Sequence, residues 1–285
     1  MTVGFVGLGN MGGVLAGNLI AAGHHVLAND LAGPERCPEG AEFAASVDSM
    51  AATADTVVVS LPDGAASEAV AGQLLAAPKR RVTHVVDTST IGVDAAVRID
   101  ERLARDGIAY VDAPVSGGVD GARARTLTVM YAANDTACAA VETVLAGLSD
   151  SRRRVGDRPG MAQAMKLLNN FLSATALAAT SEAIAFGRSV GLDMAIMLEV
   201  LNVSSGRSAA TSDKFPNHVL TGRYASGFAN TLMAKDLRLY LESVDAAGTP
   251  STFGPVTGAV WQRFVDDAPG VDFTRIYPFV EAGGS

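Results

Sequence analysis

The sequence predicts an α/β protein in which a doubly wound, mostly parallel sheet with helices on both faces is followed by an all-helical domain. Up to about residue 155, short β-branched runs alternate with stretches rich in Ala and Leu, which is the pattern of successive βαβ units. After Gly156 helix formers dominate and no strand alternation follows. A length of 285 residues suits about two domains of ~150 residues each. We therefore expect one domain over residues 1–158 and a helical domain over residues 159–285.

The candidate strands of the first domain are short and apolar. Runs such as Thr56-Val57-Val58-Val59 carry no polar alternation, so we expect them to be buried on both faces of the sheet. The strands are expected at Val3–Val6, His25–Ala28, Thr56–Leu61, His84–Asp87, Ala109–Asp112, Leu127–Ala132 and Arg153–Val155. The helices between them are expected at Met11–Ala22, Ala65–Leu75, Asp94–Arg105 and Asp135–Leu145.

A long interdomain helix is expected to join the two domains. It spans Pro159 to Val190, with Pro159-Gly160 at its start and Gly191 directly after it. About 30 residues at ~1.5 Å per residue make a rod of about 45 Å. Further helices are expected at Met194–Leu201, Ala229–Ala247 and Val256–Asp266.

Charge and cysteine content exclude several classes of protein. Acidic residues outnumber basic ones, 30 against 22, so the chain lacks the clustered Lys and Arg that nucleic-acid binding needs. Cys37 and Cys138 have neither metal nor redox spacing, which excludes a disulfide scaffold and fits a reducing cytoplasm. The His residues form no ligand spacing, and we expect no metal site.

We expect a soluble, cytoplasmic protein, because neither a secretion signal nor a membrane span is evident. Met1-Thr2-Val3-Gly4 leads directly into a strand pattern, without a positively charged region or a cleavage site. The longest apolar stretch, over residues 167–187, is broken by polar residues such as Asn169, Asn170 and Glu182, which a spanning helix would not carry.

A glycine-rich turn follows the first strand. Gly7-Leu8-Gly9-Asn10-Met11-Gly12 is a G-x-G-x-x-G sequence between a strand and a helix, where glycines allow a tight turn, close approach of a diphosphate and helix–strand packing. Asp30 closes the next strand about 20 residues further on, at the position where a carboxylate binds the ribose hydroxyls of a dinucleotide. A plain βα turn and a solvated Asp30 are the alternatives.

Other candidate binding groups follow later strands. Leu61-Pro62 and Ser89-Thr90 are expected at the carboxyl ends of strands, where doubly wound sheets bind ligands, although either could be an ordinary turn. Ser116, Gly117 and Gly118 offer a hydroxyl and open backbone N–H groups, which suit a small anion such as a carboxylate. The alternative is a loop that needs its glycines only for turning.

Two lysines complete the set of candidates. Lys166 and Asn170 are four residues apart and share one face of the long helix, which is otherwise rich in Ala, Leu and Met. Lys235 is expected near the start of another helix. An exposed Lys–Asn pair and a solvated helix end are the alternatives for these positions.

The order of these motifs resembles the β-hydroxyacid dehydrogenase family. GFVGLGNMG, SLP, DTSTIG, DAPVSGGVDGARARTLTVM, GMAQAMKLLNN and LMAKDL follow one another over essentially the whole chain. The resemblance implies a Rossmann-type cofactor domain and the transfer of a hydride between a nicotinamide and the hydroxyl-bearing carbon of a small 3-hydroxy acid. Such a reaction needs one positioned acid/base.

The resemblance also implies roles for individual residues. Cofactor binding would fall to Gly7, Gly9, Asn10, Met11 and Gly12 at the diphosphate, Asp30 at the adenosine ribose, Leu61, Pro62 and Thr90 at the nicotinamide side, and Lys235. Substrate binding would fall to Ser116, Gly117, Gly118 and Lys235. The catalytic residues would be Lys166, as acid/base, and Asn170, which orients the substrate.

Cofactor choice and oligomeric state are further expectations. The carboxylate of Asp30 would repel a 2′-phosphate, which favours NAD over NADP unless Arg36 folds over the ribose. More apolar surface on the long helix than one domain can cover predicts a homodimer or homotetramer through the helical domain.

Alternative functions remain at this point. An imine reductase shares this architecture but typically lacks the lysine found here as Lys166, and a catalytically silent cofactor-binding scaffold protein is a third possibility.

The chain also departs from the family pattern near the substrate loop. Arg125 and the pair Ala132-Ala133 stand where relatives usually have glycine. Ala209 stands where relatives often carry an aromatic residue or Asn, and Arg207 nearby offers donors for a second anion or a polyol oxygen, unless it points to solvent. A substrate bulkier or more polar than 3-hydroxyisobutyrate is therefore expected.

Overall fold

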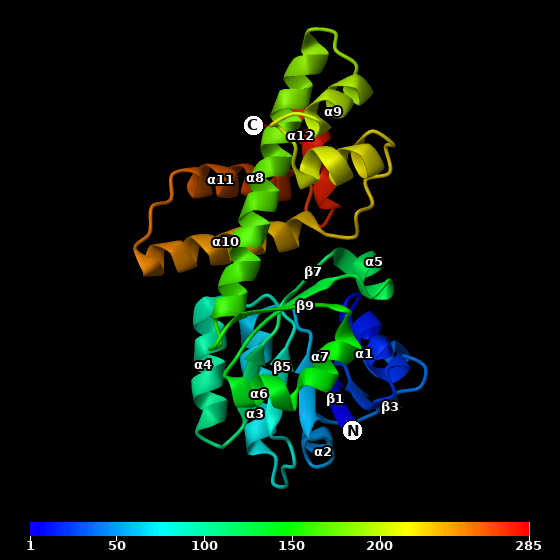
Figure 1. The fold of residues 1–285 in the computed structure, drawn as a ribbon, viewed down its shortest axis with the longest axis vertical. Helices are drawn as coiled ribbons and strands as arrows, with labels where there is room; N and C mark the ends of the chain where they lie inside the picture. The colour runs from blue at the N-terminus through cyan, green and yellow to red at the C-terminus, as the bar shows by residue number, and fades with distance from the viewer. Residues whose placement is uncertain (285) are drawn as a thin grey trace. The chain divides into compact units, whose positions relative to one another are not determined.

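The computed structural model describes residues 1–284 and divides into two compact units (Figure 1). The first unit runs from Met1 to Lys166 and the second begins at Leu167, so the division falls inside one long helix. The first unit is built on a sheet and the second on helices, as the sequence predicts.

The first unit is a sheet in the order β3-β2-β1-β4-β5-β6-β8-β7, with β9 also paired to β8. Pairs from β3 through to β6 are parallel, as is β8 with β9, while β8 runs antiparallel to β6 and β7. The bounds are β1 Thr2–Val6, β2 His25–Asn29, β3 Glu42–Phe43, β4 Thr56–Val59, β5 His84–Asp87, β6 Ala109–Asp112, β7 Val115–Ser116, β8 Thr128–Ala132 and β9 Ser151–Gly156. The predicted doubly wound, mostly parallel sheet is confirmed.

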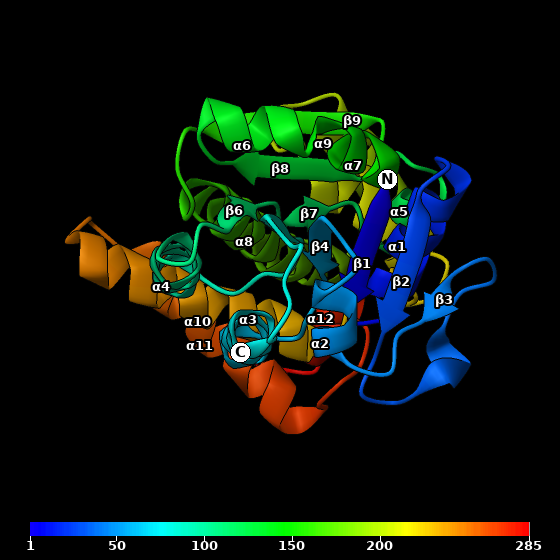
Figure 2. The ribbon, with the colours of Figure 1, turned by 90° about the horizontal axis from the view of Figure 1, so that it is seen from below.

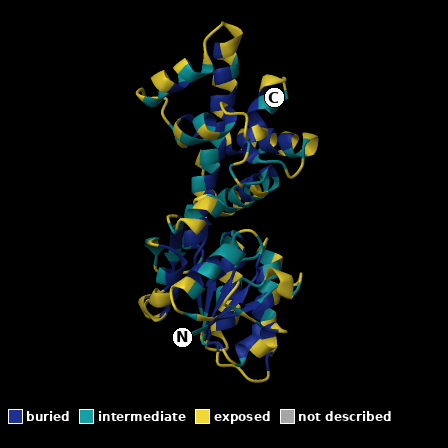
Figure 3. Ribbon diagram, turned by 90° about the vertical axis from the view of Figure 1, so that its right-hand side faces the viewer, coloured by how far each residue is buried: buried dark blue, intermediate teal, exposed yellow. Residues whose placement is uncertain are grey.

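Helices cover both faces of this sheet (Figure 2). On one face α1 (Gly12–Ala21), α5 (Gly118–Arg123), α6 (Asp135–Ala140) and α7 (Glu142–Leu148) share a core with the strands. On the other face α2 (Val47–Ala51), α3 (Gly64–Ala76) and α4 (Val93–Ala104) pack on a second core. A short 3₁₀ turn, η1 (Pro34–Arg36), follows β2. The strands are almost wholly buried, since every residue of β4 lies inside (Figure 3).

Three predicted elements differ from the structure. The helix expected over Asp135–Leu145 is broken at Val141 into α6 and α7. The strand expected over Thr56–Leu61 ends at Val59, and the one expected over Arg153–Val155 extends over Ser151–Gly156. In addition, β3 and β7 have two residues each, too few for a periodic pattern in sequence.

The second unit packs helices around an aromatic core (Figure 1). Trp261, Phe215 and Phe264 are almost fully buried there, and the Trp261 indole donates to the carbonyl of Ala174 at 3.2 Å. Its elements are α8 (Met161–Ser189, which starts in the first unit), α9 (Met194–Asn202), the π-helix η2 (Ala210–Val219), α10 (Asn230–Ala247), α11 (Phe253–Asp267), the 3₁₀ turn η3 (Phe273–Arg275) and α12 (Ile276–Glu281). None of the helices over residues 1–284 is both long enough and apolar enough to span a membrane.

Candidate active site

The glycine loop between β1 and α1 has the shape that a diphosphate needs. Gly7 has a left-handed φ of 92°, and a Cβ there would collide with the carbonyl oxygen of Ser60. A Cβ on Gly12 would collide with the carbonyl oxygen of Gly7, so this glycine lets helix and strand pack. A Cβ on Gly9 would meet nothing within 4 Å. Gly9 therefore leaves open space next to the helix N-terminus, which fits a bound pyrophosphate group.

Asp30, directly after β2, is tied to this loop. The backbone N–H of Leu8 donates to Asp30 Oδ2 at 2.6 Å, and that of Ala32 donates to Oδ1 at 2.8 Å. The side chain is only 12% exposed, so the alternative of a solvated turn residue is wrong. Arg36 lies close, with its Nη1 3.9 Å from Asp30 Oδ1. The carboxylate can still accept ribose hydroxyls with its remaining lone pairs.

The loops after β4 and β5 are joined by a hydrogen bond. The N–H of Leu61 donates to Ser89 Oγ at 2.8 Å, and Thr88 Oγ1 donates to the carbonyl of Val59 at 2.8 Å. Because parallel neighbours end at the same edge of the sheet, Leu61 and Thr90 lie at its carboxyl edge, where a dinucleotide binds. Pro62, next in the chain, is exposed.

The Ser116–Gly118 segment forms a tight turn between β7 and α5. Gly117 and Gly118 have left-handed φ values of 134° and 70°. A Cβ on Gly117 would lie 3.0 Å from Leu127 Cα, so a larger residue would push the turn off β8. Ser116 is half-buried in β7, opposite Thr128. This turn can present backbone N–H groups and a hydroxyl to a small anion.

Lys166 and Asn170 lie one turn apart on α8, and both are buried. Their side chains are 7% and 5% exposed, so the alternative of a surface pair is wrong. Asn170 Nδ2 donates to Asp236 Oδ2 of α10 at 2.6 Å, and Lys235 Nζ forms an ion pair with Asp236 Oδ1 at 3.3 Å. Lys235 is 18% exposed on the second turn of α10 and is not a solvated helix end. Asp236 thus links two predicted site residues.

Buried carboxyl groups lie at the ends of β5 and β6. Asp87 and Asp112 are both fully buried, and Tyr110 donates its hydroxyl to Asp87 Oδ2 at 3.1 Å. Burial raises the pKa of Asp87 and raises that of Asp112 to about 6, while hydrogen bonds from Gln163 pull the latter down in part. Burial and the neighbouring Asp87 likewise raise the pKa of Tyr110. Sequence reasoning assigned no role to Asp112, Gln163 or Asp236.

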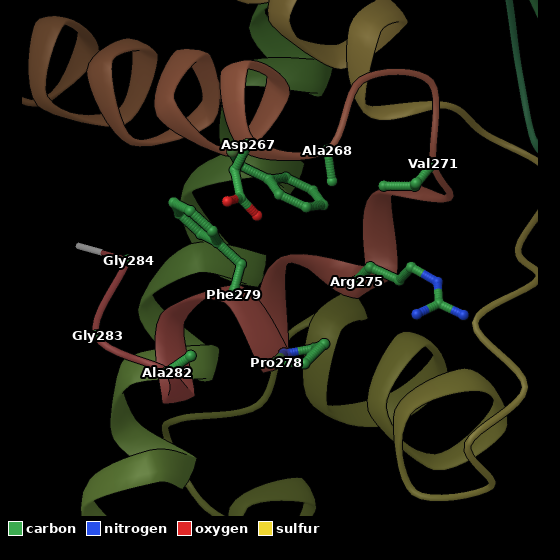
Figure 4. Close-up of a pocket in the computed structure, with 10 residues that line it drawn as sticks. Asp267, Ala268, Val271, Arg275, Pro278, Phe279, Ala282, Gly283 and Gly284 are labelled. Carbon is green, nitrogen blue, oxygen red and sulfur yellow. The ribbon is translucent and has the colours of Figure 1, made fainter.

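Two pockets of the second unit include none of the predicted site residues. One of about 450 Å³ lies against α11 and α12, with Phe264, Asp267 and Phe279 in its wall (Figure 4). The other, of about 600 Å³, is lined by Arg188 and Glu281 among others. Within residues 1–284, no group of three or more His, Cys, Asp or Glu side chains could hold a metal ion. We assign neither pocket a role.

The doubly wound sheet, its glycine loop and the acidic residue after β2 define a nicotinamide-dinucleotide-dependent oxidoreductase. Residues 2–156 match the family model described as the NAD binding domain of 6-phosphogluconate dehydrogenase. Residues 160–280 match the one described as NAD-binding of NADP-dependent 3-hydroxyisobutyrate dehydrogenase. The chain belongs to the β-hydroxyacid dehydrogenase family.

Relatives and solved structures agree over nearly the full length. The mitochondrial 3-hydroxyisobutyrate dehydrogenase of Drosophila melanogaster is 33% identical over 98% of this chain and 89% of its own. The 2-(hydroxymethyl)glutarate dehydrogenase of Eubacterium barkeri is 36% identical over 92% of this chain and 87% of its own. The 3-hydroxyisobutyrate dehydrogenase of Mycobacterium tuberculosis, solved with L-serine, has a TM-score of 0.91 at 30% identity and covers 98% of both chains.

The imine reductase alternative has weaker support. An imine reductase of Streptomyces aurantiacus has a TM-score of 0.64 at 19% identity, which shows a shared fold and nothing further. Hydroxy acid dehydrogenases match at higher identity, so hydroxy acid oxidoreduction is the supported activity.

Proposed function

We propose that this chain oxidises a 3-hydroxy acid with Lys166 as the acid/base. The observation that carries the proposal is the burial of Lys166 on α8, one turn before Asn170. When bound, the nicotinamide accepts the hydride from the hydroxyl-bearing carbon. Lys166 Nζ takes the hydroxyl proton as the hydride leaves, and burial favours the neutral amine that can do so. Asn170, held by Asp236, orients the substrate.

The substrate carboxylate binds at Ser116, Gly117 and Gly118 in this proposal. The left-handed glycines expose backbone N–H groups without side chains in the way. The cofactor diphosphate lies over Gly7, Gly9, Asn10, Met11 and Gly12, the nicotinamide side is bordered by Leu61, Pro62 and Thr90, and Lys235 closes the site from the helical domain. We also propose a functional domain boundary between residues 158 and 159.

Replacing Lys166 tests the proposal directly. Lys166→Ala should lower kcat by ~10²–10⁴-fold, the usual contribution of a positioned acid/base, and leave cofactor affinity nearly unchanged. Lys79→Ala, at an exposed position, is the matched control and should keep kcat. Near-normal turnover of the Lys166 variant, with cofactor bound, would remove Lys166 from the acid/base role.

We propose NAD rather than NADP as the preferred cofactor. The buried Asp30 carboxylate faces the ribose position, and a 2′-phosphate there would be a like-charge contact. Arg36, 3.9 Å from Asp30, is the cation that could reduce this repulsion. The ratio of kcat/KM for NAD to that for NADP should exceed one, fall in Asp30→Ser and rise in Arg36→Ala. A native ratio below one refutes the assignment.

The proposed substrate is bulkier or more polar than 3-hydroxyisobutyrate. Arg207 and Ala209 are exposed in the segment between α9 and η2, where they can meet the far end of a substrate. The similarity to a 2-(hydroxymethyl)glutarate dehydrogenase supports a second carboxylate as the group that Arg207 would bind. Arg207→Ala should raise KM for 2-(hydroxymethyl)glutarate well above its effect on 3-hydroxyisobutyrate. Equal effects, or a preference for the smaller acid, contradict this proposal.

We further propose a cytoplasmic homodimer or homotetramer that assembles through the helical domain. Large apolar side chains on α8 and α9 are exposed in the single chain, with Phe186 at 69%, Val190 at 61% and Ile196 at 60%. Contiguous apolar surface of this kind typically marks an interface. Light scattering should give a mass of two or four chains, and Phe186→Asp should reduce it. A monomer at micromolar concentration contradicts the proposal.

A further inference from the structure

Gln163, on the first turn of α8, has a side chain that uses all its hydrogen-bonding groups. Its Oε1 accepts from the N–H of Ile91 at 2.9 Å and from that of Gly92 at 3.2 Å. Its Nε2 donates to the carbonyl of Ser89 at 3.0 Å and to Asp112 Oδ1 at 2.7 Å. The side chain is fully buried. It therefore joins the 89–92 loop, the end of β6 and the start of α8 at one point.

Asp112 completes the same junction from the strand side. Its Oδ2 accepts from the backbone N–H of Gly160 at 2.9 Å and from that of Gln163 at 3.0 Å. These are amides of the first turn of α8, which lack partners within the helix. A carboxylate from β6 thus caps a helix that begins 48 residues later.

Each of the three joined segments carries a residue of the proposed site. Thr90 follows Ser89 directly, Ser116 lies four residues after Asp112, and Lys166 lies one helical turn after Gln163. We propose that Gln163 is a positioning residue that fixes Lys166 of α8 against the 89–92 loop and the end of β6. This inference rests on the proposed acid/base role of Lys166.

Only an amide side chain fits these four contacts. The two backbone N–H groups of the 89–92 loop need an acceptor, whereas Asp112 and the Ser89 carbonyl need donors. Glutamate would place a second carboxylate against Asp112, with the buried Asp87 and the hydroxyl of Tyr110 nearby. Methionine has similar length but can satisfy none of the four. A displacement of about 1 Å at the reacting groups can lower a rate by ~10²-fold.

The test compares Gln163→Met with Gln163→Glu over pH 6 to 8, with Gln73→Glu, an exposed position on α3, as the control. We expect kcat of Gln163→Met to fall ~10–100-fold at every pH, with little change in KM for the cofactor. The deuterium isotope effect on kcat, with substrate labelled at the reacting carbon, should rise because hydride transfer becomes slower than product release. The Gln73 control should match the native enzyme.

Gln163→Glu supplies a readout that a purely structural role would not move. Protonated glutamate can donate to Asp112 again, so its kcat should approach the native value as the pH falls from 8 to 6. The deficit of Gln163→Met should stay constant over the same range. Burial of the neighbouring carboxyl groups makes such protonation accessible near neutral pH.

Several outcomes would overturn the inference. Native kcat in a folded Gln163→Met, or an unchanged isotope effect, would leave Gln163 with no positioning role. Failure of both variants to fold would assign Gln163 to stability instead. If Lys166→Ala retains turnover, the proposed function fails first. If Lys166→Ala loses turnover but Gln163→Met does not, only the positioning inference fails.

Discussion

Arg125 combines an unfavourable backbone conformation with favourable side-chain contacts, and substitution can separate the two. Its φ is 59°, in the left-handed region, where a residue other than glycine costs roughly 1–2 kcal/mol. Its guanidinium donates to the carbonyls of Ala146 and Gly147 near the end of α7, at 2.9 Å each, and to Asp150 at 2.9 Å. A cation at a helix C-terminus is also favoured by the helix dipole.

The sizes of these effects predict an order of stability. Arg125→Ala keeps the strained backbone and loses the side-chain contacts. At ~1 kcal/mol for each carbonyl bond, and little for the exposed Asp150 pair, its free energy of unfolding should fall by about 2 kcal/mol. Arg125→Gly loses the same contacts but relieves the strain, so we expect it to be about 1 kcal/mol more stable than Arg125→Ala and still less stable than the native chain.

Urea denaturation followed by circular dichroism measures this order. Arg123→Ala is the control, because Arg123 and its partner Asp120 are both mostly exposed and the change should stay within about 0.5 kcal/mol. If the alanine variant is as stable as the glycine variant, the left-handed conformation costs nothing measurable. A glycine variant more stable than the native chain would show that the guanidinium contacts do not stabilise.

Further predictions concern the buried charges and the glycine loop. The pKa of Asp112 is raised to about 6, so its contribution to stability is fully present below pH 3.8 and is lost as the pH rises through 6; relative to Asp112→Asn, the native free energy of unfolding should fall by about 3 kcal/mol over that range, and parallel pH profiles would contradict this. Asp236→Ala, which frees Asn170, should lower kcat/KM roughly 10-fold while the exposed Asp245→Ala does not, as steady-state kinetics will show. Gly12→Ala should lower the Tm through its clash with Gly7, whereas Gly9→Ala should keep the Tm and weaken cofactor binding; equal Tm values would refute the distinction.

The elements found correctly from sequence are those specified by their own residues. The strand β4 is buried on both faces, so its β-branched run indicates it without any knowledge of its neighbours. The glycine loop has a sequence dictated by local sterics, at Gly7 and Gly12. The long helix α8 is bounded by Gly160 and Gly191, both of which have left-handed φ values.

The elements missed depend on partners far away in the chain. Strand β3 exists because Glu42 and Phe43 pair with Leu27 and Ala28, and two residues show no period. The π-helix η2 contains Pro216, a residue that sequence rules place outside helices.

The same reason limits the site. Lys166 and Asn170 are visible in sequence because a cation and an amide share one face of an apolar helix. Asp236 gains its role only through a hydrogen bond across 66 residues, and Asp112 and Gln163 meet across 51. Neither spacing follows any local rule, so only the folded chain reveals these positions.

The cap that Asp112 places on α8 has a consequence for biosynthesis. At roughly 5–20 residues per second, every strand of the sheet emerges from the ribosome before Gly160 and Gln163. Until they arrive, a carboxylate at the centre of the nascent domain has no donors from α8, so the sheet waits for the next segment of the chain before its interior is complete. The last step in maturation of the cofactor-binding half is therefore coupled to translation of the helix that follows it.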